Sequence, residues 1–302
     1  MQTWILFFSL MSQFSFAGQI HETFFYKGAP TSDQISEWST LQGKRGYRID
    51  LQDPLAWDLE VFNKLQGADR IQLEITKYPG EDTVKAWTHL AEQGAELVVL
   101  VGLLPNDNDI DRLNRIGFSR YVFGLNDVPS IQETRRLAKL KAPTAITFIT
   151  GSYPKYPDKE VFQAIPLATP LLFTVDYWPQ YTHMDTLNLL PQHKRIQMTQ
   201  DVFPTDSDVQ YLRKVRDLDE ITFLTTDDAA PINGWAKFGA IPVRWSCKNW
   251  VPTQKALDAF AGSAVPGGAR RLSLDQDQPL ETAERTRLEK SAVPVEWVHA
   301  AP

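Results

Sequence analysis

Cysteine is almost absent from this sequence, because Cys247 is the only one among 302 residues. One cysteine cannot form a disulfide within the chain, and it cannot supply the several thiolates of a zinc or iron–sulfur centre. The fold must therefore rest on a hydrophobic core, for which 43% of hydrophobic residues is sufficient. We expect the Cys247 thiol to be buried and unreactive.

The signatures of several enzyme classes are also missing. The sequence contains no G-x-S-x-G elbow, no Walker phosphate-binding loop and no His-Glu-x-x-His segment. Its five histidines show no spacing typical of metal ligands. The sequence therefore predicts neither a metal nor a cofactor.

An excess of positive charge and a long apolar stretch are lacking as well. The net charge of -6 argues against general affinity for nucleic acid, which depends on Lys and Arg neutralising phosphates. After the N-terminal segment, no stretch reaches the roughly 20 apolar residues that a membrane-spanning helix needs. We expect no nucleic-acid partner and no membrane span, and the sequence leaves the oligomeric state open.

The N-terminal segment has the features of a secretory signal peptide. Residues Trp4 to Phe8 form a short apolar core, and Ser15-Phe16-Ala17 is a small-x-small cleavage pattern. Residues 1–17 are therefore predicted to be a signal peptide, and residues 18–302 a single mature domain. The protein is expected to be exported, to the periplasm or the extracellular space.

Short strand-like segments recur roughly every 25 residues along the mature chain. Between them, apolar residues step by three, which is typical of one face of a helix or of a tight helical turn. Each unit is thus predicted to contain a strand, a loop and a short helix. The twelve strand segments start near Phe24, Tyr47, Ile71, Val98, Tyr121, Ile146, Leu171, Ile196, Ile221, Ile241, Leu272 and Val295.

This rhythm resembles the leucine-rich repeat family over nearly all of the mature chain. The family prefers Leu at the apolar positions, where this chain often has Ile, Phe, Tyr, Val or Ala. At the position where the family prefers Asn, only Asn126 matches, and an apolar-proline pair such as Trp178-Pro179 follows in several units. The resemblance implies an open, parallel-strand α/β solenoid of about twelve units.

A (β/α)8 barrel is the alternative fold, because it also alternates strands and helices. Its strands would bring the acids that follow them, Asp176, Asp201, Asp227 and Asp228, to one mouth. Two of these acids could then flank a glycosidic bond, as in a secreted carbohydrate-active hydrolase. Against this, Asp176 occupies the slot that Asn126 fills in its own unit, which favours a framework role.

In the solenoid, alternate strand residues would form an exposed concave face with an apolar centre and an arginine rim. Such a composition is typical of protein interaction surfaces, and arginine also pairs with carboxylates and phosphates. We therefore expect a protein that binds another protein or a cell-envelope polymer and is not an enzyme. The residues predicted to contact the partner are Arg48, Arg70, Val99, Val101, Arg120, Val122, Ile149, Leu172, Arg195 and Arg244.

Overall fold

The structure is a computed structural model. It describes residues 22–27, 30–40, 45–51, 70–75, 77–92, 96–99, 104–125, 129–141, 145–165, 169–198, 203–225, 234–276 and 280–300. The predicted signal peptide, residues 1–17, lies outside these ranges. So do Val101 and three of the four candidate acids, Asp201, Asp227 and Asp228.

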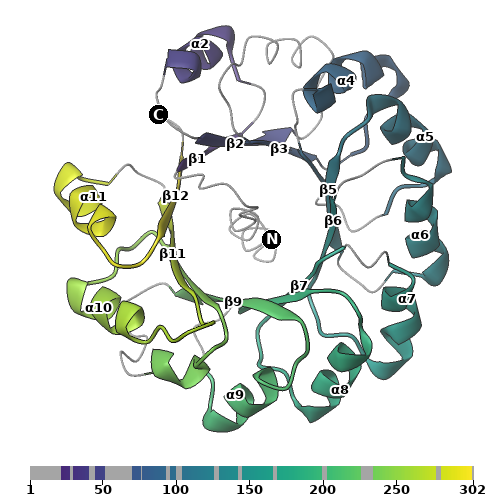
Figure 1. The fold of residues 1–302 in the computed structure, drawn as a ribbon. Helices are drawn as coiled ribbons and strands as arrows, with labels where there is room; N and C mark the ends of the chain where they lie inside the picture. Colours follow the sequence, from purple (N-terminus) through teal and green to yellow (C-terminus); the bar gives the residue numbers. More distant parts are fainter. Residues whose placement is uncertain are drawn as a thin grey trace.

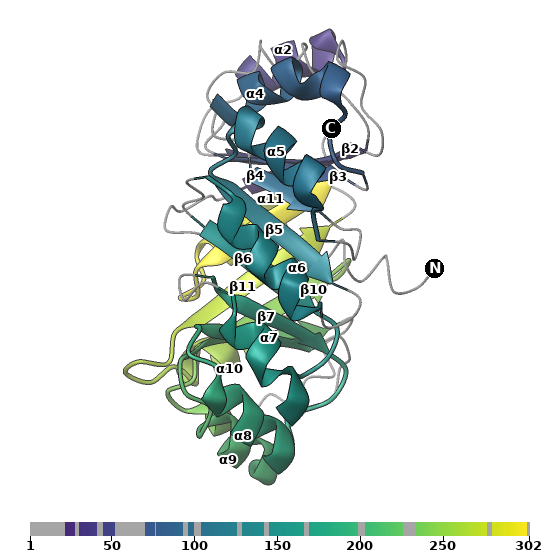
Figure 2. The same ribbon diagram turned by 90° about the vertical axis from the view of Figure 1, so that its right-hand side faces the viewer.

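Within the described residues, twelve parallel strands form one sheet that closes into a barrel. Each strand pairs with its neighbours in sequence, and β1 also pairs with β12. Figure 1 shows the resulting ring, and Figure 2 shows its strands inclined in side view. The strands are β1 (Glu22–Lys27), β2 (Arg45–Leu51), β3 (Arg70–Ile75), β4 (Glu96–Val99), β5 (Arg120–Leu125), β6 (Ala145–Thr150), β7 (Leu171–Val175), β8 (Lys194–Met198), β9 (Leu218–Thr225), β10 (Val243–Lys248), β11 (Arg270–Gln276) and β12 (Val295–Ala300).

Short helices connect the strands and cover the outside of the ring (Figure 1). The α-helices are α2 (Ser32–Thr40), α4 (Val84–Glu92), α5 (Asp107–Ile116), α6 (Ile131–Arg136), α7 (Lys159–Gln163), α8 (Tyr181–Leu189), α9 (Asp206–Leu212), α10 (Gln254–Gly262) and α11 (Thr282–Glu289). The single 3₁₀ turns are η3 (Glu81–Thr83), η4 (Leu137–Lys139), η5 (Tyr156–Asp158) and η6 (Trp235–Phe238).

The parallel α/β class and all twelve strand positions are confirmed, with β10 starting two residues after Ile241. The open solenoid is wrong, because β1 pairs with β12 and the sheet has no free edge. The eightfold barrel is also wrong, because the ring closes with twelve strands. Closure leaves no unpaired strand edge, which an open sheet would have to protect.

The hydrophobic core lies between the ring and the helices. Because side chains alternate along a strand, every second residue points outward into this layer. Phe123, Phe148 and Phe173 occupy such positions on three consecutive strands and are fully buried. The rings of Phe123 and Phe148 lie 5.8 Å apart. Cys247 also belongs to this core, so its predicted burial is confirmed.

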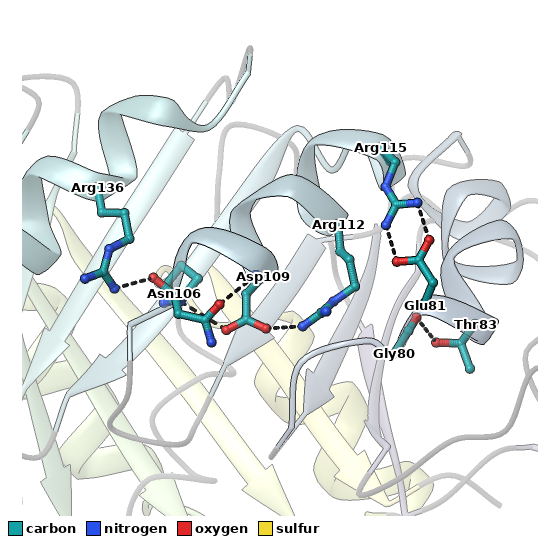
Figure 3. A network of polar contacts seen from close by, with 9 residues as sticks. Gly80, Glu81, Thr83, Asn106, Asp109, Arg112, Arg115 and Arg136 are labelled. Atoms are coloured by element: carbon teal, nitrogen blue, oxygen red, sulfur yellow. Dashed lines mark hydrogen bonds and ion pairs between the residues drawn. The ribbon is translucent and has the colours of Figure 1, made fainter.

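The recurring prolines lie directly before the helix N-caps, two residues before the first helical residue. In three units the N-cap side chain accepts a hydrogen bond from the backbone of the third helical residue, whose carboxylate accepts one in return. In α5, for example, both of these bonds are 3.0 Å long (Figure 3). The pairs are Asn106 with Asp109, Ser130 with Glu133, and Thr205 with Asp208, after Pro105, Pro129 and Pro204.

Polar contacts also join each unit to the next. Arg115 of α5 forms an ion pair with Glu81, and Arg136 donates to the Pro105 carbonyl at 3.1 Å (Figure 3). The Asn188 side chain at the end of α8 donates to the carbonyl of Lys214 at 3.0 Å and accepts from the amide of Arg216 at 2.8 Å. Such contacts fix the spacing of neighbouring helices around the ring.

The predicted apolar centre of the concave face is not exposed. Val122 and Ile149 are fully buried and Leu172 is 5% exposed, because these residues point into the barrel and the sheet surrounds them. At β4 the register pairs Val99 with Phe123, so the strand alternation there is shifted by one residue from the prediction. The expected solvent-facing patch is therefore an interior surface.

This correction reverses the expected effect of a charge at Val122. We predict that Val122→Glu destabilises the protein by several kcal/mol, because a buried charge without a partner is poorly solvated. Phe123→Ala, on the outer face of the same strand, should lose about 3 to 5 kcal/mol. Urea unfolding of the purified variants measures both changes.

The matched control is Val265→Glu, because Val265 is 42% exposed. This variant should change the free energy of unfolding by no more than about 0.5 kcal/mol. If Val122→Glu is as mild as Val265→Glu, the interior surface is solvated and the burial described above is wrong.

Candidate functional site: the inner wall of the barrel

The inner wall of the barrel is the surface made by the strand residues that point away from the helices. It carries an unusual number of polar side chains with little exposure. Buried polar groups are normally few and each needs a hydrogen-bond partner, so their concentration on one surface indicates a functional site. The buried polar residues of the wall are Asp50, Gln72, Glu74, Thr174, Gln197, Glu220, Thr222, Arg244, Ser246 and Ser273.

Arginines gather where the strands begin. Arg120 is the first residue of β5, and Arg195, Arg244 and Arg271 are each the second residue of their strands. The register aligns Arg244 with Arg271 on the same row of the wall. Of the predicted contact residues, Arg195 and Arg244 thus lie on the wall, whereas the side chains of Arg48 and Arg70 lie outside the described residues.

A buried ion-pair network lies at this end of the wall. The Arg244 side chain is 1% exposed, donates from Nε to Glu220 at 3.0 Å, and contacts the Glu296 carboxylate through Nη1. Arg271, which is half exposed, approaches Glu220 at 3.7 Å. Burial disfavours the charged guanidinium, but the two carboxylates outweigh that effect and raise the pKa of Arg244.

Several polar side chains of the wall have an atom with no hydrogen-bond partner within the described part of the chain. These atoms include Thr174 Oγ1, Arg195 Nε, Gln197 Oε1 and Ser273 Oγ. Thr174 and Gln197 are direct register partners on β7 and β8. An unpartnered buried polar group destabilises a fold by about 1 to 3 kcal/mol. These atoms are therefore the ones that a bound molecule would satisfy.

The candidate acids do not form a pair in the described residues. Asp176 lies exposed in the turn after β7, while its three predicted companions lie outside the described ranges. Trp178, next to it, is buried and stacks on Phe223 with ring centroids 6.1 Å apart. Across the described chain, no group of three or more His, Cys, Asp or Glu could hold a metal ion.

Next to Asp176, aromatic rings cluster around His183. The rings of Tyr153 and Tyr177 lie 5.2 Å and 5.5 Å from the His183 ring. His183 Nδ1 accepts the backbone N–H of Gln180 at 3.1 Å, the role that a carboxylate plays in the other caps. Burial also lowers the pKa of His183. The imidazole is therefore held neutral as a helix cap.

The sequence analysis predicted this face of the strands but did not select Thr174, Gln197 or Glu220 as site residues. The period-two reading that placed Arg195 on this face also places Gln197 and Thr174 there, yet uncharged residues gave no reason to select them. Glu220 directly precedes Ile221 and shares the face of Thr222, so alternation also places it on the wall, although it was not selected.

No protein-family model matches the chain, and no curated protein matches it. None of the helices within the described residues has the length and apolar character that a membrane crossing requires.

The ion-pair network gives a stability prediction. Arg244→Met leaves Glu220 and Glu296 buried without their cation, so we expect a loss of about 3 to 5 kcal/mol near neutral pH. The triple variant that adds Glu220→Gln and Glu296→Gln should recover much of this loss. Arg271→Met is the control and should lose no more than about 1 kcal/mol. Equal losses for Arg244→Met and Arg271→Met would contradict the network's role.

The neutral His183 cap gives a pH prediction. A histidine with a lowered folded-state pKa contributes its full stability above the unfolded value of about 6.5, and loses it as the pH falls below that value. Urea unfolding of both proteins at about pH 7.5 and about pH 5.5 measures this loss. Between these two pH values, the free energy of unfolding should fall more for the native protein than for His183→Gln, since Gln can also cap the helix. An identical pH dependence of the two proteins would refute this assignment.

Proposed function

We propose that this chain is an exported binding protein that holds an extended segment of a protein or cell-envelope polymer against the inner wall of its barrel. The observation that carries the proposal is the set of unpartnered polar atoms on the wall, at Thr174, Arg195, Gln197 and Ser273. A fold that keeps such atoms buried loses stability unless a ligand provides their partners.

The strand number supports a ligand of this shape. The diameter of a barrel grows roughly linearly with the number of strands, and eight strands are just filled by their own side chains. Twelve strands make the ring about 1.5 times wider, which suits one extended chain better than a globular partner. The arginines at the beginning of the strands would meet such a chain where it enters.

The acids predicted for a carbohydrate hydrolase do not support that alternative function. A glycoside hydrolase needs two carboxyl groups on either side of the bond that it cleaves. Of the acids predicted for a hydrolase, only Asp176 is described, and it lies on an exposed turn. On the wall, Glu220 and Glu296 are both engaged by Arg244, and Asp50 and Glu74 are register partners on β2 and β3. Export of the chain and its relation to leucine-rich repeats are part of this proposal, supported by the N-terminal segment and the repeating unit.

The test compares two arginines of similar exposure. Arg271 on the wall has a side chain 49% exposed, and Arg285 on the outer helix α11 has one 46% exposed. Adding a solubilised cell-envelope polymer fraction at saturating concentration should raise the melting temperature of the native protein. Arg271→Ala should weaken binding about tenfold, whereas Arg285→Ala should leave it unchanged.

Both variants should fold, because each residue is half exposed and its ion pair contributes little to stability. The Arg285 guanidinium also lies 5.7 Å from the Trp297 ring, a contact worth about 1 kcal/mol. The proposal fails if no envelope fraction, before or after protease treatment, raises the melting temperature. It also fails if the two variants bind equally well, because binding would then not involve the inner wall.

A further inference from the structure

We infer that Thr174, Arg195 and Gln197 form a subsite that reads the hydroxyl groups of a carbohydrate chain. This inference rests on the proposed binding function and names the class of ligand. The three residues lie together on two paired strands. Thr174 of β7 pairs with Gln197 of β8, and Arg195 lies two residues before Gln197 on the same face.

The unpartnered atoms require both a donor and an acceptor from the ligand. Gln197 Oε1 can only accept a hydrogen bond, and Arg195 Nε can only donate one, whereas the Thr174 hydroxyl can do either. A phosphate or carboxylate group offers acceptors alone and would leave Gln197 Oε1 unsatisfied. A sugar hydroxyl both donates and accepts, and neighbouring hydroxyls on one ring can satisfy neighbouring side chains.

The surroundings of the subsite do not demand a charged ligand. Gln197 of β8 is the register partner of Thr222 of β9, which is also buried and uncharged. The nearest described cation on that row, Arg244, is already held by Glu220 and Glu296. The charge within the subsite is that of Arg195, whose register partner on β9 is the acidic residue Glu220. A neutral chain can therefore donate to Gln197 and accept from Arg195 without bringing a further charge onto the wall.

A peptide fits this surface less well. Extended peptides are usually bound by adding a strand to a free sheet edge, with their own backbone hydrogen bonds giving the affinity. The closed ring has no such edge, because every strand is paired on both sides. A ligand inside the ring is thus recognised by side chains alone, and on this part of the wall those side chains are polar.

The experiment measures binding of defined probes to the mature chain by calorimetry. The probes are cellotetraose, maltotetraose and chitotetraose as neutral carbohydrates, inorganic polyphosphate as a chain with acceptors only, and an uncharged Ser/Gly peptide. We expect at least one carbohydrate to bind, and Thr174→Val and Gln197→Met each to weaken it about tenfold. Neither variant should lower the melting temperature, since each removes a buried polar atom without a hydrogen-bond partner among the described residues.

Thr186→Val is the matched control. The Thr186 hydroxyl is equally buried but donates to the Thr182 carbonyl at 3.2 Å, on a helix outside the ring. This variant should lose stability and keep its affinity for the carbohydrate, the reverse of Thr174→Val.

The outcomes separate this inference from the proposed function. If envelope polymer stabilises the protein but only polyphosphate or the peptide binds among the probes, the carbohydrate subsite is wrong and the binding function stands. If Thr174→Val destabilises the protein as Thr186→Val does, the hydroxyl already has a partner and the subsite is wrong. If nothing binds, both proposals are wrong.

Discussion

The pairing of β1 with β12 is the constraint on which the other features depend. Once these strands pair, one face of the sheet is enclosed by the barrel and the other face is covered by the helices. The outside is covered by short helices and forms an ordinary apolar core, with Phe123 and Phe148 in contact across neighbouring strands. The inside is shielded from bulk solvent by the sheet itself, so polar residues placed there lose water without gaining a conventional core.

Closure with so many units requires each unit to be well defined on its own. The capping boxes at Asn106, Ser130 and Thr205 start helices that are too short to be stable in isolation. The contacts of Asn188 then fix the end of α8 to the turn that follows α9. Because these devices use backbone groups and small polar side chains, the core residues are free to vary from one unit to the next.

The sequence allowed the strand positions to be predicted, because each unit contains its own alternation and its own turn residues. It did not reveal closure, since the join of β1 and β12 depends on strand tilt and stagger summed over the whole ring. That one missing fact changed the interpretation of Val122 and Leu172 from exposed to buried. Strand alternation places Glu220 on the same face as Thr222, but it could not reveal the ion pair of Glu220 with Arg244, which lies 24 residues further along the chain.

The inner wall contains two kinds of polar group, and they point to different roles. Arg244 with Glu220 and Glu296 is internally satisfied, so its removal should affect folding first. Thr174 and Gln197 are not satisfied by the described chain, so they weaken the fold in the free state. Natural proteins usually satisfy their buried polar groups, and the exceptions are found mostly at functional sites. Under the proposed function, the row from Gln197 to Arg244 runs from a side chain that a ligand would satisfy to one that the protein's own carboxylates satisfy.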